Sequence, residues 1–196
     1  MSITTLFLIR HGQTDWNLAG KLHGHADIPL NATGKEQAQR VAQFLKKKQA
    51  SLAALYSSDL QRAHQTAHAI SELFALEIIL AADLREGHFG KLEGLTKKEK
   101  LDLYGPMTDE ELPEKVGAEP RNKVVARVIN YLNTIVQKHK NQHVAIVTHG
   151  WLLHSLLTHL GHNVSELPAL TNESITTFTW HANRQMFVFE SIEHAD

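Results

Sequence analysis

The sequence predicts an α/β fold, a three-layer α/β/α sandwich in which helices cover both faces of a mostly parallel sheet. Short apolar segments alternate with longer amphipathic segments through most of the 196 residues, which is the pattern of successive strand and helix units. The first apolar segment shows no polar alternation, as is typical of a strand buried on both faces. The length suits one domain, so we predict a single domain over residues 1–196.

The spacing of apolar residues and a helix-capping motif predict the strands and helices of the first half of the chain. Residues 5–9 are a short apolar run, and Ala38 and Leu45 lie two helical turns apart in the next segment. Thr33 and Glu36 fit a capping box, which predicts that this helix begins at Thr33. In order, we predict a strand at 5–9, a helix at 33–49, a strand at 53–57, a helix at 60–74 and a strand at 77–81.

The second half begins with a looser stretch. Glycine and proline are frequent between about residues 87 and 122, and we predict that this excursion runs over the face of the domain and covers the substrate. Within it, Thr96 and Glu99 fit another capping box, so a short helix is expected from Thr96. The remaining elements are a helix at 122–138, a strand at 143–148, an apolar helix at 151–160 ended by Gly161, and strands at 175–180 and 185–192.

The composition limits the partners and the compartment. The formal net charge is −1, so no broad electrostatic field attracts nucleic acid or an anionic membrane. Cysteine is absent, which excludes a thiolate zinc site and a cysteine nucleophile and fits a reducing compartment. Neither an apolar run of membrane-spanning length nor a signal peptide is recognised. We therefore expect a cytoplasmic protein that binds neither nucleic acid nor membranes.

Polar residues follow several of the predicted strands. Arg10 and His11 come directly after the first strand, and His149 comes directly after a later one. The segment 57–59 leads from the second strand towards Arg62. Functional groups of parallel sheets collect at the carboxyl ends of the strands. We therefore expect these side chains to meet at one edge of the sheet.

Such a group suits the binding of a phosphate monoester. Arg10 and Arg62 offer forked donors that match phosphate oxygens. Gly150 lies just before the helix at 151–160, whose N-terminal N–H groups favour an anion, and its missing side chain permits a close approach. His149 beside it supplies a further donor.

His11 is the candidate nucleophile. A neutral imidazole attacks phosphorus without first losing a proton, and neighbouring arginines disfavour its protonated form. The leaving alkoxide needs a proton, for which Glu86, in the polar loop after the third strand, is the candidate donor. Taken singly, Arg62, Glu86 and His149 fit structural roles as well. Their shared position at strand ends is what indicates chemistry.

Five segments resemble the motifs of the histidine phosphatase superfamily, also called the phosphoglycerate mutase-like family. The resemblance covers about residues 5–180, nearly the whole chain, and implies that family's α/β sandwich. The matching segments are 8–17 (LIRHGQTDWN), 24–30 with Gly34 and Gln37-Ala38, 57–63 with Thr66-Ala67, 84–86 with Phe89-Gly90 and Glu93-Gly94, and 147–150.

The resemblance implies a role for each residue that matches a motif. His11 would be the residue that is phosphorylated. Arg10, Arg62 and His149 would bind the transferred phosphoryl group, and Glu86 would be the proton donor.

Three further residues are implied in binding. Asn17 would contact phosphate, and the backbone of His23 and Gly24 would contact the substrate. The phosphatase branch of the family implies no metal and no organic cofactor. The expected partner is therefore a small phosphorylated metabolite.

Residues of the excursion at 87–122 indicate which branch of the family the chain resembles, the phosphatases or the mutases. Cofactor-dependent mutases carry two adjacent arginines there, whereas Arg121 is the only arginine at 87–122. Gly87 stands where mutases usually have arginine, while Lys97 matches a mutase lysine. We therefore expect hydrolysis of a small phosphate monoester, as in the α-ribazole and sugar-phosphate phosphatases. Phosphoglycerate mutase is the alternative, and a phosphate-binding module without catalysis is a third.

Overall fold

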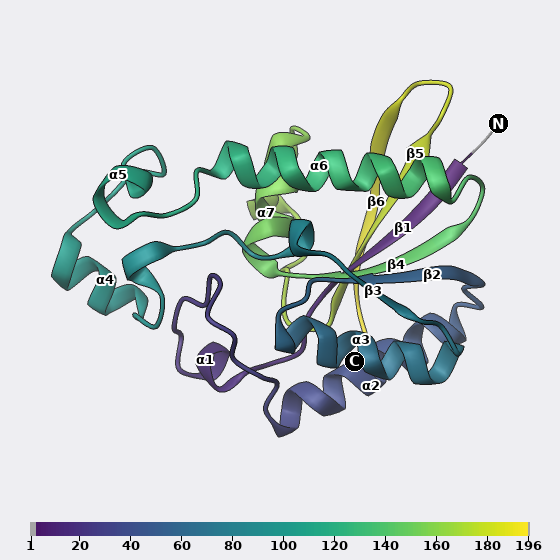
Figure 1. Cartoon of the computed structure of the whole chain (residues 1–196), viewed down its shortest axis with the longest axis horizontal. Helices are drawn as coiled ribbons and strands as arrows, with labels where there is room; N and C mark the ends of the chain where they lie inside the picture. Colours follow the sequence, from purple (N-terminus) through teal and green to yellow (C-terminus); the bar gives the residue numbers. More distant parts are fainter. Residues whose placement is uncertain (1–2, 196) are drawn as a thin grey trace.

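A six-stranded sheet with the order β3-β2-β4-β1-β5-β6 runs through the computed structural model, which describes residues 3–195 (Figure 1). Its strands are β1 (Ile3–Arg10), β2 (Leu52–Ser57), β3 (Ile78–Leu80), β4 (His143–Thr148), β5 (Ser174–His181) and β6 (Met186–His194). The pairs among β1 to β4 are parallel, and β5 and β6 add an antiparallel hairpin. The carboxyl ends of the four parallel strands therefore share one edge.

Helices cover both faces of this sheet. Figure 1 shows α2 and α3 on one face, and α6 and α7 on the other. The helices are α1 (Asp15–Leu18), α2 (Ala32–Lys47), α3 (Gln61–Phe74), α4 (Lys97–Tyr104), α5 (Leu112–Val116), α6 (Arg121–Lys138) and α7 (Gly150–His159). Short 3-10 helices are η1 (Ala82–Leu84), η2 (Gly90–Leu92) and η3 (Val164–Glu166). Within residues 3–195, no helix combines the length and apolarity that crossing a bilayer requires.

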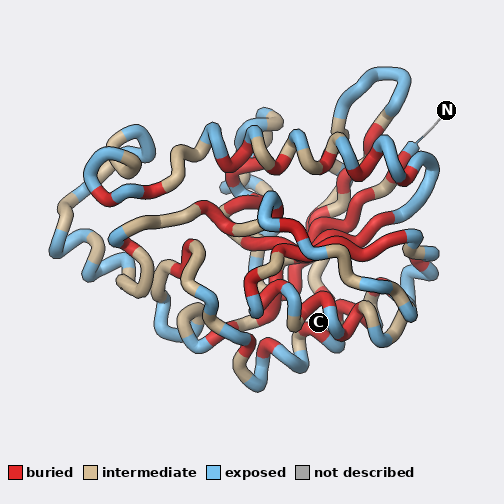
Figure 2. The backbone as a smooth tube through the Cα atoms, viewed as in Figure 1, coloured by how far each residue is buried: buried red, intermediate tan, exposed pale blue. Residues whose placement is uncertain are grey.

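Strand β1 contributes side chains to two hydrophobic cores, one on each face of the sheet. Leu6 and Leu8 pack in the cluster that α6 and α7 complete, whereas Phe7 and Ile9 pack in the cluster formed with α2 and α3. Alternate side chains of a strand point to opposite faces, so a strand between two helical layers is apolar at every position. Figure 2 shows the resulting buried centre along the strands. The predicted three-layer sandwich with a mostly parallel sheet is confirmed.

The predicted strands and long helices agree with the structure to within a few residues, but one predicted cap is wrong. Helix α2 begins at Ala32, and its N-cap is Asn31, whose side chain accepts a hydrogen bond from the Gly34 N–H. Thr33 therefore lies inside the first turn, where it cannot cap the helix. The second predicted box is confirmed, because Glu99 Oε2 accepts from the Thr96 N–H at 2.7 Å.

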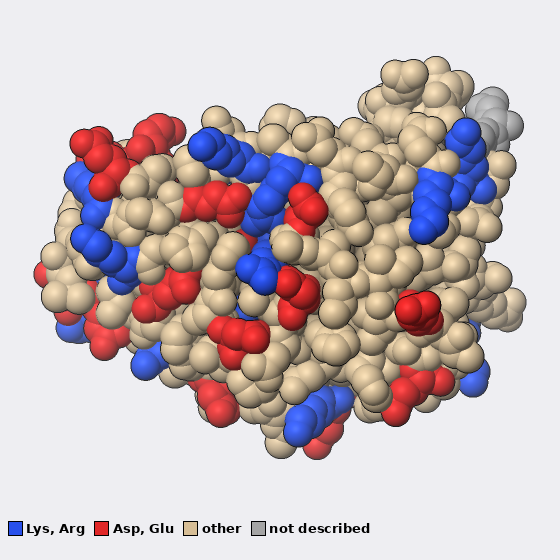
Figure 3. Space-filling model, in the orientation of Figure 1, with Lys and Arg blue, Asp and Glu red and all other residues tan. Residues whose placement is uncertain are grey.

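The excursion at 87–122 forms η2, α4 and α5 at the far left of Figure 1. It has a small apolar cluster of its own around Leu92, Val116 and Ala118. Two backbone hydrogen bonds tie it to the loop after α1, from Leu22 N to Leu95 O at 2.9 Å and from Gly94 N to Leu22 O at 2.8 Å. On the face seen in Figure 3, its acidic and basic side chains are interspersed rather than gathered by sign.

Candidate active site

The ends of β1 and β4 bring two histidines together. His11 follows β1 and His149 follows β4, and the His11 N–H donates to the Thr148 carbonyl at 3.0 Å as an extension of the parallel pairing. The two imidazole centroids are 5.1 Å apart. The expected meeting of these segments at one edge of the sheet is what the structure shows.

Hydrogen bonds define the protonation state of His11. Its Nδ1 lies 2.7 Å from the Gly12 carbonyl, which can only accept, so the neutral ring carries its proton on Nδ1. Nε2 is left with a lone pair and accepts from Arg62 Nε–H at 3.2 Å. Burial lowers the pKa of His11 well below its usual 6.5, and the charges of Arg62 and Arg10 lower it further. His11 is therefore neutral at physiological pH, with a nucleophilic nitrogen.

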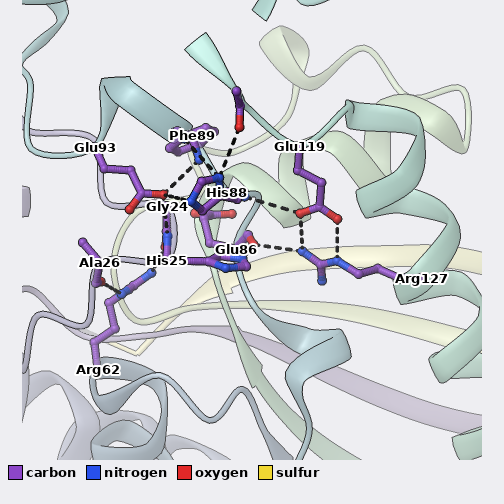
Figure 4. Close-up of polar contacts among 12 residues, drawn as sticks. Gly24, His25, Ala26, Arg62, Glu86, His88, Phe89, Glu93, Glu119 and Arg127 are labelled. Atoms are coloured by element: carbon purple, nitrogen blue, oxygen red, sulfur yellow. Dashed lines mark hydrogen bonds and ion pairs between the residues drawn. The ribbon is translucent and has the colours of Figure 1, made fainter. Parts of the chain in front are cut away.

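Arg62, in the first turn of α3, is completely buried with a relative exposure of 0%. Its two terminal nitrogens donate to the carbonyls of Gly24 and Ala26, each at 2.8 Å (Figure 4). Burial lowers the pKa of Arg62 to about 10, and the nearby Glu86 carboxylate opposes that shift. Arg62 thus keeps its positive charge at physiological pH and holds it against His11.

Arg10 donates to the Leu170 carbonyl and presents a buried Nε with no hydrogen-bond partner. The guanidinium lies against Gly150, where a Cβ would approach Arg10 Nε to 2.9 Å. Gly150 was expected to admit a ligand to the helix backbone. Arg10 packs into the space that the missing side chain leaves, and Gly150 also lines the cavity over His11, so the close approach of a ligand to its backbone stays a prediction.

His149 is the N-cap residue of α7 and is also completely buried. Its Nε2 lies 2.8 Å from Ser58 Oγ, and its Nδ1 has no partner. Because the Ser58 hydroxyl can donate to Nε2, His149 Nδ1–H remains available as a donor. Ser58 follows β2 and lies within a recognised motif, yet no pattern in the sequence indicates this role.

Hydrogen bonds hold both the side-chain carboxylate and the backbone carbonyl of Glu86. Its carboxylate accepts from the N–H groups of Leu152 at 2.8 Å and Trp151 at 3.3 Å, at the start of α7. Its carbonyl accepts from His25 Nε2 and from an Arg127 terminal nitrogen, each at 2.9 Å. Burial raises the pKa of Glu86 above its usual 4.5, and that effect outweighs the positive charge of Arg62. This carboxyl can therefore hold a proton more readily than an exposed one.

The three predicted binding residues have different positions. Asn17 Oδ1 accepts from the Thr14 N–H at 3.1 Å and from Asn172 Nδ2 at 3.3 Å, which leaves the Asn17 amide donors for a ligand. His23 faces the same cavity and lies 2.6 Å from Thr14 Oγ1 through its Nε2. Gly24 does not line that cavity, and its carbonyl binds Arg62 instead.

A cavity of about 400 Å³ opens over this group. Its polar end is formed by Arg10, His11, Asn17, His23 and Glu86. Its other walls are mainly apolar and include Leu22, Phe89, Trp151, Val164 and Leu170. Arg62 and His149 do not line it, because both lie fully buried beside His11. Within residues 3–195, no group of three or more His, Asp or Glu side chains is placed to hold a metal ion.

Three contributors to the site were missed in the sequence. Asn172 donates to the carbonyl of His11 at 2.9 Å, and Leu170 accepts from Arg10. Both lie in the irregular segment before β5, which has neither periodicity nor a recognised motif. Lys21 was also missed as a cavity residue. Its position two residues before His23, within the loop after the nucleophile, was the one available signal.

The buried histidines predict that stability falls in mild acid. Burial lowers the pKa of His11 and His149 well below 6.5 and that of His23 to about 4. Between pH 6.5 and 4 the unfolded chain therefore binds protons that the folded chain excludes, so the unfolding free energy falls as the pH falls. Each such proton contributes up to about 1.4 kcal/mol per pH unit. Glu86, with its raised pKa, acts in the opposite direction.

Urea unfolding followed by tryptophan fluorescence between pH 7.5 and 4.5 measures this dependence. The midpoint should decrease steadily below pH 6.5. A variant with His23→Gln should lose part of the slope, because one of the excluded protons is gone. A midpoint that is constant over this range would contradict the assignment of neutral buried histidines.

Sequence and structure comparisons place the chain among known proteins. The family model "Histidine phosphatase superfamily (branch 1)" matches residues 6–192. A metal-independent phosphoserine phosphatase of Arabidopsis thaliana is 34% identical over 198 residues, covering 96% of this chain and 81% of that protein. Phosphoglycerate mutase-like protein 4 of the same plant is 36% identical over 182 residues, covering 88% and 78%.

Solved structures agree with the sequence comparison. YhfR of Bacillus stearothermophilus superposes with a TM-score of 0.85 and 28% identity, covering 98% of this chain and 100% of that one. Phosphoserine phosphatase of Entamoeba histolytica, solved with 3-phosphoglyceric acid, gives 0.78 and 29%, covering 97% and 96%. The match of the family model over nearly the whole length, together with these relatives, shows that the chain belongs to the histidine phosphatase superfamily.

Proposed function

We propose that the protein hydrolyses a small phosphate monoester through a phosphohistidine at His11, with Glu86 as the proton donor. The observation that carries this proposal is the hydrogen bond from His11 Nδ1 to the Gly12 carbonyl, at 2.7 Å. It leaves Nε2 as the nucleophilic atom, beside the fixed charge of Arg62 and in the same cavity as the Glu86 carboxyl.

In the first half of the reaction, His11 Nε2 attacks phosphorus in line and the bond to the ester oxygen breaks. Glu86 gives its proton to that oxygen, so the alcohol leaves neutral and Glu86 becomes a carboxylate. Arg10 offers donors to the non-bridging oxygens from the wall of the cavity, and Arg62 and His149, which lie beside His11, offer theirs as phosphorus approaches Nε2. The product of this half is a phosphoryl group bonded to Nε2.

In the second half, the Glu86 carboxylate takes a proton from a water molecule that attacks the phosphohistidine. The bond from phosphorus to Nε2 breaks, inorganic phosphate is released, and His11 returns to its neutral form. Glu86 is again protonated, so both residues are ready for another substrate. The two steps together consume the ester and one water molecule and release the alcohol and inorganic phosphate, with His11 and Glu86 restored.

Three features of the excursion favour water over a second hydroxyl as the acceptor. Gly87 lies against Trp151, where a Cβ would approach Cζ3 to 2.6 Å, so no larger side chain reaches the cavity from this position. Lys97 lines a separate groove of about 460 Å³ rather than the cavity that contains His11. Arg121 is committed to an ion pair with Asp109 at 2.8 Å and to the face of Trp151.

The proposal is tested by assaying phosphate release in EDTA from p-nitrophenyl phosphate, O-phosphoserine and 3-phosphoglycerate. Steady release with a phosphoryl group trapped on His11 during turnover would support it. Conversion of 3-phosphoglycerate to its isomer, dependent on a bisphosphate primer and without release of phosphate, would establish the mutase instead. Binding of phosphate with neither activity would establish a module without catalysis.

The walls of the cavity indicate the chemistry of the alcohol. Among the described residues that line it, Lys21 is the one lysine, and it lies beside Trp16 with its Nζ 5.8 Å from the ring centroid. His154 also lines the cavity, but burial lowers its pKa, so it is neutral at physiological pH. We propose that Lys21 binds a carboxylate on the alcohol part, a group that phosphoserine carries.

Replacement of Lys21 by methionine tests this preference, because methionine keeps a similar length and removes the charge. We expect kcat/KM for O-phosphoserine to fall about tenfold, or about 1.4 kcal/mol, while that for p-nitrophenyl phosphate stays within about twofold. Lys21→Arg is the matched control and should retain the selectivity. Equal losses on both substrates would remove Lys21 from substrate recognition.

A further inference from the structure

Glu93, just after η2, links two loops of the site that are distant in sequence. Its Oε1 accepts from the N–H of His25 at 2.9 Å and from the N–H of Phe89 at 3.0 Å (Figure 4). The approach is possible because Gly24, with φ of +53°, has no side chain, and a Cβ there would collide with the Glu93 carboxylate. One carboxylate oxygen thus joins residues 23–26 to residues 86–89.

The first of these loops holds the buried arginine. The carbonyls of Gly24 and Ala26, on either side of His25, each accept from a terminal nitrogen of Arg62. Arg62 Nε in turn donates to His11 Nε2. A shift of the His25 backbone therefore moves both carbonyls that orient Arg62, and with them the charge beside the nucleophile.

The second loop carries the proton donor. Glu86 lies three residues before Phe89, and its carbonyl accepts from His25 Nε2 at 2.9 Å. Arg127 donates to the same carbonyl and is itself held by Glu119 at 3.0 and 3.2 Å. His25 is therefore joined to the 86–89 loop twice, through Glu93 at its backbone and through the Glu86 carbonyl at its ring.

Glu93 itself is outside the cavity. It is not among the residues that line it, and the side chain is 17% exposed beside His88, at 3.6 Å from His88 Nε2. Its negative charge also helps to keep Arg62 protonated, behind the larger contribution of Glu86. Any effect of Glu93 on the reaction must therefore pass through the two loops or through Arg62.

We infer that Glu93 is a positioning residue that holds Arg62 and Glu86 in register across the site, by accepting from the backbone of both loops. The inference rests on the proposed function, in which Arg62 binds the phosphoryl group and Glu86 supplies the proton. A misplacement of about 1 Å between such groups lowers a rate by about a hundredfold. The acceptor geometry of Glu93, more than its charge, carries this role.

Three substitutions separate geometry from charge. Glu93→Ala removes the acceptor and should lower kcat/KM about tenfold to a hundredfold. Glu93→Gln keeps an acceptor oxygen at the same reach and should stay within about threefold of the wild type. Glu93→Asp keeps the charge but is one methylene shorter, so it should resemble Glu93→Ala. The matched control is Glu111→Ala, which removes an acceptor of a backbone N–H within the excursion and away from both loops.

Binding of inorganic phosphate, measured by titration calorimetry, gives a readout that does not depend on turnover. Glu93→Ala and Glu93→Asp should weaken it about tenfold through Arg62, whereas Glu93→Gln and Glu111→Ala should leave it unchanged. If the wild type binds phosphate but releases none from any ester, the proposed function fails while this comparison still decides the inference.

The inference is overturned if Glu93→Asp behaves as the wild type, because the charge alone would then suffice. It is equally overturned if Glu93→Gln loses as much as Glu93→Ala. Thermal unfolding of each variant accompanies the assays. If Glu93→Ala does not fold, the Gln and Asp variants alone settle the question. A role through acceptor geometry predicts a higher kcat/KM for Glu93→Gln than for Glu93→Asp, whereas a role through charge predicts the opposite.

Discussion

Replacement of His11 by alanine is expected to lower kcat/KM for every phosphate monoester by at least about a thousandfold. The substitution removes the nitrogen that we propose as the phosphoryl acceptor, and the sequence contains no cysteine to replace it. Rapid acid-free quenching with a radiolabelled substrate should trap a phosphorylated wild-type chain and an unlabelled variant. Mapping of the label should place it on the peptide that contains His11.

A buried histidine away from the site provides the control for this experiment. His139, at the end of α6, lies 2.9 Å from the Tyr56 hydroxyl and is 9% exposed. A variant with His139→Gln should lose stability while keeping kcat/KM. Turnover by the His11→Ala variant at the rate of the wild type would exclude a phosphohistidine at this residue.

Glu86→Gln is expected to reveal the proton donor through its dependence on the leaving group. For an alkyl phosphate such as O-phosphoserine, we expect kcat to fall by a factor of about 10² to 10⁴, because the alkoxide can no longer be protonated. For p-nitrophenyl phosphate the loss should be much smaller, because its leaving group is stable as an anion. Steady-state rates of both substrates on both proteins measure the difference.

The pH dependence of the rate, compared between the wild type and Glu86→Gln, gives a second, independent check on the proton donor. The proposed mechanism requires neutral His11 and protonated Glu86, and burial lowers the pKa of the first and raises that of the second. The wild-type rate should therefore fall as the pH rises through the pKa of Glu86, and Glu86→Gln should lack that alkaline limb. An unchanged limb in the variant, or equal losses on both substrates, would assign the proton to another group.

The parts of the site that the sequence predicts are those carried by regular elements. Arg10, His11 and His149 directly follow apolar strands, and parallel strands end at one edge, so their meeting follows from strand positions alone. The same reasoning brings Arg62, which follows β2, to His11, but it does not predict the other partners of Arg62, which are carbonyls of an irregular loop. Such contacts depend on the conformation of residues 23–26, for which periodicity supplies no information.

Two details depend on local conformation that the sequence pattern does not supply. Gly24 has a positive φ and its carbonyl accepts from Arg62, whereas the contact of its backbone with the substrate stays a prediction. The start of α2 was placed at Thr33, yet Asn31 caps the helix, because its Oδ1 accepts from the Gly34 N–H three residues later. Side-chain hydrogen bonds are involved in both cases, within one helical turn for Asn31 and across 38 residues for Gly24, and several residues of a loop satisfy the same sequence pattern equally well.

The contact between Gly87 and Trp151 constrains how this active site can evolve. A Cβ at position 87 would lie only 2.6 Å from Cζ3 of the Trp151 indole, which is a steric clash. A larger residue at position 87 therefore fits only after the residue at position 151 has become smaller. Changing position 151 first avoids this collision, because a smaller residue there enlarges the cavity that Trp151 lines. An evolutionary path from this cavity to one with an arginine beside Glu86 therefore has a preferred order, with position 151 changing first.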